Sequence, residues 1–246
     1  NIERSILKPE ALPGNIENYI GAVQIPIGIA GPILIKGIDT DTYVPVPIAT
    51  TEGALISSIT RGSRVCNRAG GVNVAVTRQF MVRAPVFFCE DMHGALNLEQ
   101  WIHNNFEKLR DKAHSVSSVA RLRDIETFVF GATLHAKFRY TTGDASGQNM
   151  TTACTWVACE WLIKEIKNDR SIKYRSYLIE GNMSGDKKVN LQNYVSGRGI
   201  GVIANIHVPG RILSNILRVD PEKYIRHIEA ASVSAMPSTT PPSMAP

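Results

Sequence analysis

Residues 128–140 show the most regular alternation of apolar and polar side chains in the chain. A period of two is typical of a strand with one buried face, because successive side chains of a strand point to opposite sides of the sheet. The pattern predicts a half-buried antiparallel strand. The side chains expected on its buried face are Phe128, Phe130, Ala132, Leu134, Ala136, Phe138 and Tyr140. The opposite face would carry Val129, Thr133, His135, Lys137 and Arg139.

The residues after Thr51 follow the period of an amphipathic helix instead. Thr51 can act as the N-cap, and Gly70-Gly71 would end the helix. Ser58 and Arg61 are three residues apart, so both side chains are expected on one face, away from the apolar stripe. That stripe consists of Leu55, Ile56 and Ile59.

Similar patterns predict the remaining elements. The expected strands are 23–36 around a turn at Gly31-Pro32, 43–49, 72–89, 175–180 and 197–209. The other expected helices are 96–111, 151–166, 209–218 and one opened by Asp220-Pro221. Residues 231–246 are rich in Ser, Thr and Pro and predict a disordered tail.

Composition narrows the class of protein. Of 246 residues, 43% are hydrophobic and 20% are charged, which is typical of a globular chain with one or two domains. No apolar run reaches the roughly 18 residues that predict a membrane-spanning helix. The first residues lack the layout of a secretion signal, so we expect a cytoplasmic protein. Whether a membrane anchor precedes Asn1 stays open.

Charge and cysteine usage exclude two further classes. The net charge of +5 is weak and scattered, which argues against a nucleic-acid surface and fits a pocket for a small phosphorylated anion better. The four cysteines form no C-x-x-C pair, so reduced thiols are expected and a metal site is not.

Three segments carry candidate chemistry, although each alone also has a structural explanation. Asp186-Lys187-Lys188 could stabilise a carbonyl oxygen that gains negative charge, or could be a solvated basic turn. Glu52 could transfer a proton, or could favour a helix start through the helix dipole. The loop GDASGQN could present backbone N–H groups to phosphate, but it matches no standard nucleotide fingerprint.

In combination these segments are far more specific. ENYIGAVQIPIGIAGP, PIATTEGALISSITRG, TTGDASGQNM, GNMSGDKK and SGRG occur in this order, and the likeness extends from about residue 10 to about residue 220. Together they resemble the 3-hydroxy-3-methylglutaryl-coenzyme A (HMG-CoA) reductases of the eukaryotic type (class I). The resemblance implies reduction of HMG-CoA to mevalonate in isoprenoid biosynthesis, with NADPH as the cofactor and active sites at dimer interfaces.

The resemblance implies an α+β fold in which a ferredoxin-like, NADP-binding small domain is inserted into a large domain. Residues 1–84 and 179–230 would form the large domain, which binds substrate and CoA and dimerises. Residues 85–178 would form the inserted domain, and the family's central helix and C-terminal part would be missing. Glu17-Asn18-Tyr19-Ile20-Gly21 matches the family's dimer motif, so a homodimer or higher oligomer is expected.

The resemblance also implies roles for individual side chains. Glu52 and Lys187 match the catalytic glutamate and lysine, and Arg83 matches an arginine that contacts the acyl group. A lysine can stabilise the oxyanion of a reduced thioester, a glutamate can pass a proton, and arginines suit CoA phosphates. The other substrate or CoA positions are Ser58, Arg61, Asn182, Asp186 and Lys188, and the cofactor positions are Asp144, Gly147, Asn149 and Ser117.

The chain departs from the family pattern at several positions. Ser118 stands where the family has an arginine for the 2′-phosphate of NADPH. Glu180 stands where the family has a serine that contacts the acyl group, and Val189-Asn190 replaces a proline-alanine pair. The family's catalytic aspartate and the histidine that protonates the CoA thiolate would lie beyond this sequence.

Three functions are therefore open at this point. The principal expectation is part of a working reductase, with activity impaired in this chain alone. The second is a diverged enzyme that uses the Glu/Lys pocket without hydride, as a cyclase or isomerase in natural-product biosynthesis. The third is a catalytically inactive CoA-binding or dimerising module. The lost arginine favours the second and third functions over the first.

Overall fold

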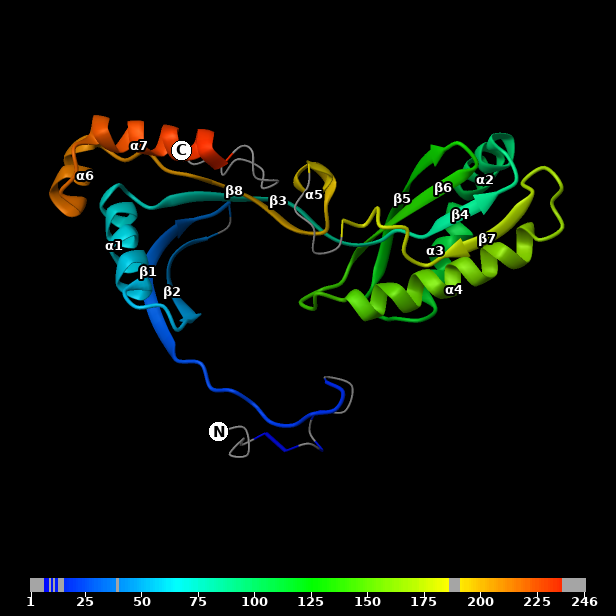
Figure 1. Ribbon diagram of the computed structural model, residues 1–246, viewed down its shortest axis with the longest axis horizontal. Coiled ribbons are helices and arrows are strands. Elements are labelled where there is room, and N and C mark those ends of the chain that lie inside the picture. Colours follow the sequence, from blue (N-terminus) through cyan, green and yellow to red (C-terminus); the bar gives the residue numbers. More distant parts are fainter. Residues whose placement is uncertain are drawn as a thin grey trace. The chain divides into compact units, whose positions relative to one another are not determined.

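The computed structural model describes the chain except residues 1–6, 9, 11, 13–15, 39, 186–190 and 236–246, and the side chains of 191, 192, 194 and 233–235. The chain divides into two compact units. The first contains Asn1–Ala75 and Ala204–His227, and the second is built mainly from Val76–Ile203 (Figure 1). Each unit combines helices with strands, so the fold is a mixed α/β fold. The predicted boundaries of the large domain and of the inserted domain remain predictions.

A curled β-hairpin forms the centre of the first unit (Figure 1). Strand β1 (Ile27–Lys36) pairs antiparallel with β2 (Asp41–Ala49), and helix α1 (Leu55–Arg68) packs on β1. Helix α6 (Gly210–Leu217) contacts α1, and α7 (Pro221–Ala235) follows it.

Side chains of α1 bond the hairpin where its pairing is irregular. The register shifts between Ala30 and Ile33, on either side of a cis Gly31–Pro32 bond. The hydroxyl of Thr60 accepts the N–H of Gly31. Asn67 accepts the N–H of Leu34 and donates to the carbonyl of Pro32. These bonds fix how α1 lies on the hairpin.

Strand β6 (Thr133–Thr141) organises the sheet of the second unit. It pairs along one edge with β5 (Arg121–Phe130). Along its other edge it pairs first with β4 (Val86–Cys89) and then with β3 (Val72–Arg83). Strand β7 (Tyr174–Leu178) pairs with β4, and β8 (Gly199–Asn205) pairs with β3.

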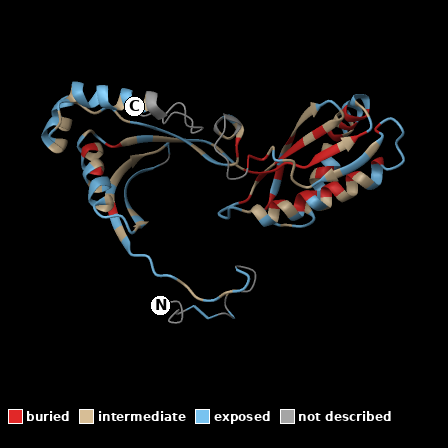
Figure 2. Cartoon of the chain, viewed as in Figure 1, coloured by how far each residue is buried: buried red, intermediate tan, exposed pale blue. Residues whose placement is uncertain are grey.

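Three helices and one face of this sheet form the apolar core. They are α2 (Met92–Asn104), α3 (Phe106–His114) and α4 (Gln148–Ile166). Figure 2 shows the buried residues concentrated on these helices and on the strands of this unit. The fully buried side chains include Leu98, Ile102, Leu109, Leu134, Phe138, Tyr140, Cys159 and Leu162. All four cysteines are free.

The predicted alternation is correct for β6 and wrong for the preceding residues. Leu134, Ala136, Phe138 and Tyr140 are all buried, as expected. Phe130 is instead exposed, because Gly131 turns the chain into a hairpin in which Val129, not Phe128, lies opposite Leu134. Directly opposite residues share a face, so the turn reverses the phase of the pattern.

Three other element predictions need correction. The strand expected over 72–89 is broken at Ala84-Pro85, where proline has no N–H for a ladder bond. The helix expected over 96–111 is two helices that meet at Asn105, whose φ of −112° is not helical. Helix α7 continues through residues 231–235, so the predicted tail is wrong there, since Ala230 and Ala231 favour helix. Residues 236–246 lie outside the described part.

One buried hydrogen bond links sheet and helix in this core. The hydroxyls of Tyr140 and Thr155 are 2.9 Å apart, and both residues are fully buried. We expect Thr155→Val to lower the free energy of unfolding by about 1–3 kcal/mol, because the Tyr140 hydroxyl would lose its partner. Urea titration followed by tryptophan fluorescence measures this, because Trp101, Trp156 and Trp161 all lie in the second unit.

Two variants control for other causes of that loss. Thr152→Val on the same helix reports the cost of valine alone, since Thr152 is only partly buried. The double variant Thr155→Val with Tyr140→Phe should lose less than the sum of the single losses, because neither hydroxyl then remains unpaired. Equal losses for Thr155→Val and Thr152→Val would contradict the expectation.

Candidate functional site

Glu52 lies in the turn that precedes α1 rather than in the helix. Its backbone N–H donates to the hydroxyl of Thr50 at 2.9 Å, and its side chain is exposed. Ala54, with a left-handed φ of 64°, is the residue before the first helical position, Leu55. The helix therefore begins later than the predicted cap at Thr51. Glu52 stands free for contact with a ligand.

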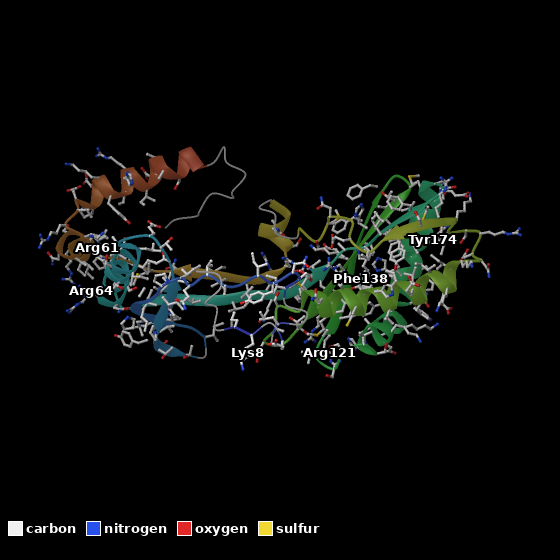
Figure 3. The ribbon with its side chains drawn as sticks, turned by 60° about the horizontal axis from the view of Figure 1, so that its bottom comes forward. Lys8, Arg61, Arg64, Arg121, Phe138 and Tyr174 are labelled. Carbon is white, nitrogen blue, oxygen red and sulfur yellow. The ribbon has the colours of Figure 1, made fainter. Side chains whose placement is uncertain are left out.

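Ser58 and Arg61 lie together on the exposed side of α1, as the spacing predicts. They line an open hollow of about 470 Å³. Arg64 also lines it, one helical turn beyond Arg61, and Figure 3 shows both arginines extending from α1. Sequence reasoning missed Arg64, although its spacing of three from Arg61 was the available signal. The complete lining is Ala54, Ser57, Ser58, Thr60, Arg61 and Arg64.

A second hollow, of about 450 Å³, lies beside the loop between β6 and α4. Asp144 is among its lining residues and is exposed. Gly147 precedes α4 with φ of 76°, and a Cβ there would lie 2.5 Å from the side chain of Thr142. Only glycine fits that position. Asn149 follows in the first turn of α4.

The turn that contains Ser117 lies against this loop. A Cβ on Gly143 would stand 3.3 Å from the side chain of Val119. The hydroxyl of Ser117 accepts the N–H groups of Val119 and Ala120, which closes the turn. The structure thus brings Ser117 close to the segment of Asp144, Gly147 and Asn149.

Two arginines on β5 border the same turn. Arg121 donates to the carbonyl of Ser117 at 3.2 Å, and Arg123 donates to the hydroxyl of Thr141 at 3.2 Å. Arg121 is labelled in Figure 3. Nearby, His114 Nε2 accepts the N–H of Leu122, which requires the neutral ring. Burial, together with Arg121 and Arg110, lowers the pKa of His114.

Arg83 stands at the end of β3 with its side chain 10% exposed. Its Nη1 donates to Glu180 Oε2 at 3.0 Å. The other carboxylate oxygen of Glu180 accepts the N–H of Asn182 at 2.8 Å and the hydroxyl of Ser184 at 3.0 Å. Arg83 Nε is buried without a hydrogen-bond partner among the described residues. Asn182 itself is exposed, with a left-handed φ of 69°.

His135 lies under the same loop. Its Nδ1 is buried without a partner in the described part of the chain. A Cβ on Gly181 would lie 2.9 Å from that nitrogen and 2.7 Å from Val86, so only glycine permits this approach. Burial lowers the pKa of His135, and the charge of Glu180 partly opposes that shift.

Asp186, Lys187 and Lys188 lie outside the described residues. The segments on either side are bonded to the rest of the unit. Asn193 in α5 (Leu191–Ser196) donates to the carbonyl of Gly185. Arg78 donates to the carbonyls of Asn193 and Val195. The predicted role of Lys187 therefore stays a prediction.

A buried lysine on β6, Lys137, is bonded to the last residue of α5. Lys137 Nζ donates to the carbonyl and the hydroxyl of Ser196 at 2.7 and 2.9 Å, and Glu126 lies 3.6 Å away. Burial lowers the pKa of Lys137, while Glu126 opposes that shift. The alternating pattern placed Lys137 on a polar face but gave no sign that α5 covers it.

Within the described ranges, no group of three His, Cys, Asp or Glu side chains is placed to hold a metal ion. None of the helices in those ranges is both long and apolar enough to cross a bilayer. In the predicted dimer motif, Ile20 is 79% exposed, and assembly remains a prediction.

Comparisons with known proteins agree with the sequence motifs. The sequence model of the family "Hydroxymethylglutaryl-coenzyme A reductase" matches residues 1–240. The 3-hydroxy-3-methylglutaryl-coenzyme A reductase of Methanothermobacter thermautotrophicus is 40% identical over 212 residues, covering 86% of this chain and 52% of that protein. The enzyme of the same name from Pyrococcus abyssi is 38% identical over 220 residues, covering 89% and 52%. This chain spans about half the length of these relatives.

A solved structure shares the fold. It is the class II 3-hydroxy-3-methylglutaryl-CoA reductase from Streptococcus pneumoniae bound to NADPH in open conformations. The TM-score is 0.67 at 19% identity, with 89% of this chain and 55% of that chain covered.

The burial of His135 predicts a dependence of stability on pH. Because its pKa is lower in the folded chain than in the unfolded chain, the unfolded state binds more protons near pH 6. His135 therefore contributes no penalty above its unfolded pKa of about 6.5 and destabilises the fold as pH falls below it. We expect His135→Gln to reduce the loss of stability between about pH 7.5 and about pH 5.5.

Urea titrations at several pH values, followed by tryptophan fluorescence, measure this slope. His93→Gln is the matched control, because His93 lies in the same unit and is exposed. His114 should also contribute, so a part of the slope should remain in His135→Gln. A slope identical to that of the unaltered chain would contradict the expectation.

Proposed function

Because the chain belongs to the hydroxymethylglutaryl-coenzyme A reductase family, we propose that it supplies the thioester-binding and cofactor-binding parts of an NADPH-dependent reductase. The family reaction is the reduction of HMG-CoA to mevalonate. The observation that carries the proposal is the pair of arginines beside serine hydroxyls in one hollow on α1. The family match does not favour the non-redox enzyme or the inactive module.

The hollow on α1 is the proposed site for the phosphates of CoA. Arginine binds phosphate through several charge-assisted hydrogen bonds at once, which makes it the preferred residue for such groups. Arg61 and Arg64 are both exposed and one helical turn apart. Ser58 adds a hydroxyl donor between them and the turn of Glu52.

The hollow beside the β6–α4 loop is the proposed site for NADPH, which supplies the hydride when bound. The fit rests on three features of this chain. The hollow is open, Gly147 brings the backbone close to Thr142, and the 19-residue helix α4 has no side-chain cap at its N-terminus. Such a helix end favours phosphate. Asp144, Asn149 and Ser117 would supply the polar contacts to the nucleotide.

The chemical step would draw on Glu52 and Lys187. A lysine beside the thioester carbonyl would stabilise negative charge on its oxygen, and Glu52 would donate a proton to that oxygen. Asp186 and Lys188 flank the lysine, and Asn182 with Arg83 would contact the acyl group. Glu52 is exposed and ready for such contact, while Lys187 is assigned from sequence alone.

The finer features of the fold are also part of the proposal. Helices on one face of the β6 sheet support a ferredoxin-like, NADP-binding domain over residues 85–178. Residues 1–84 and 179–230 would then form the large, substrate-binding domain. Assembly through Glu17-Asn18-Tyr19-Ile20-Gly21 would complete the active site.

Removal of either arginine on α1 should weaken CoA binding. We expect Arg61→Ala and Arg64→Ala each to lower the affinity for coenzyme A by about tenfold, the effect of losing one charge-assisted contact. Titration calorimetry with free coenzyme A measures this. Arg68→Ala is the matched control, because Arg68 is exposed on the same helix but does not line the hollow. An equal loss for Arg68→Ala would indicate a nonspecific charge effect and contradict the assigned site.

The cofactor preference should be weak. Ser118 offers a neutral hydroxyl where the family has an arginine, so we expect less than about tenfold preference for NADPH over NADH. Ser118→Arg should raise NADPH affinity by about tenfold or more and leave NADH affinity unchanged. Calorimetry with both cofactors tests this. A strong preference in the unaltered chain that Arg123→Gln removes would show that Arg123 already binds the 2′-phosphate.

A further inference from the structure

In the ion pair between Arg83 and Glu180, both carboxylate oxygens accept hydrogen bonds, whereas the guanidinium donates to the carboxylate through Nη1 alone. Both oxygens of the Glu180 carboxylate are engaged, by Arg83, the N–H of Asn182 and the hydroxyl of Ser184. The loop thus folds around its own carboxylate. The guanidinium uses only Nη1 for this pair, and its buried Nε has no partner among the described residues.

An arginine fork has a strong preference for a carboxylate, which it normally binds with two parallel N–H donors. Here the carboxylate comes from the chain itself. A ligand group held in the same molecule competes at a high effective concentration, so an external carboxylate must displace it. Displacement would cost the bond from Arg83 Nη1 to Glu180 Oε2, and binding without displacement would place two negative charges at one guanidinium.

The surroundings keep Glu180 in this place. Gly181 packs tightly against Val86 and His135 and donates its N–H to the carbonyl of Ala84 at 2.7 Å. Ser184 is buried, and the Glu180 side chain is 28% exposed. Two buried nitrogens near the carboxylate loop, Arg83 Nε and His135 Nδ1, have no hydrogen-bond partner among the described residues.

We propose that Glu180 is an internal carboxylate ligand of Arg83 that sets acyl specificity. Because Glu180 already engages the guanidinium, a terminal carboxylate on the acyl chain of a CoA thioester gains little affinity from Arg83. This inference rests on the proposed function, which places the acyl group near Arg83. The role requires no movement of the loop, only retention of the observed pair.

Two thioesters that differ by one carboxylate test the role. HMG-CoA carries the terminal carboxylate, and 3-hydroxy-3-methylbutyryl-CoA lacks it. Calorimetry on the 246-residue chain should show no more than about threefold tighter binding of HMG-CoA. Glu180→Ser should shift the ratio by about tenfold or more toward HMG-CoA, since Arg83 would become available to the ligand. Adding Arg83→Met to Glu180→Ser should abolish that shift.

Two further variants control for unfolding of the loop and for the loss of a negative charge elsewhere in the unit. Glu180→Gln preserves the size and the hydrogen-bonding oxygen of the side chain, so it should shift the ratio in the same direction without unfolding the loop. Glu160→Gln is the matched control, because Glu160 is a partly buried glutamate of the same unit whose carboxylate accepts the Tyr177 hydroxyl. It should leave the ratio unchanged. Far-ultraviolet circular dichroism checks that each variant is folded.

The outcomes separate this inference from the proposed function. If free coenzyme A does not bind, the proposed function is wrong and the inference falls with it. If coenzyme A binds but the unaltered chain prefers HMG-CoA by more than about threefold, the inference alone is overturned. It is likewise overturned if folded Glu180→Ser and Glu180→Gln leave the ratio unchanged.

Discussion

Buried charge on the second face of the β6 sheet is the constraint on which much of the second unit depends. One face of β6 contributes apolar side chains to the helical core, whereas the other carries His135, Lys137 and Arg139. Ser196 of α5 bonds Lys137, whose side chain is only 1% exposed. Charge removed from water must be paired or hydrogen-bonded, because desolvation costs more than any single surface contact returns.

The partners of these charges, and of Arg83 on β3, come from other elements of the unit. Ser196 satisfies Lys137, Asp124 pairs with Arg139, and Glu180 pairs with Arg83. As a result, residues 180–185 and 193–198, which flank the Asp-Lys-Lys motif, are bonded to the sheet. A site needs such support, because a reacting group is effective only when neighbouring bonds hold it in place. The same bonds explain why Glu180 reaches Arg83 at all.

In the first unit, side chains of helix α1 bond backbone groups that the irregular strand pairing leaves unpaired. Its inner side chains, Thr60 and Asn67, bond the irregular stretch of β1 and so fix the rotation of the helix about its axis. With that rotation fixed, the outward positions follow from a repeat of 3.6 residues per turn. Ser58, Arg61 and Arg64 therefore face a common hollow. Thr60 both bonds β1 and lines the hollow, so it connects the structural face of the helix with the candidate binding face.

Local patterns in the sequence determined the main elements and the family. The apolar alternation of Leu134 to Tyr140, the helical spacing of Ser58 and Arg61, and the ordered motifs depend only on residues close together in the chain, so they could be recognised without a structure. Turns and helix ends were less predictable. A single residue with left-handed φ can shift the start of a helix, as Ala54 does, or reverse which face of a strand is apolar, as Gly131 does. Side-chain type alone does not predict where this happens.

Only the tertiary structure decided which charged groups meet. Sequence shows Glu180 at an unusual position and Arg83 in a family motif, but 97 residues separate them. The burial of Lys137 and the contact of the Ser117 turn with Gly143 are of the same kind. Each depends on how strands and loops distant in the chain pack together, and pairings of this kind leave no periodic signal in the sequence because no local repeat connects the partners.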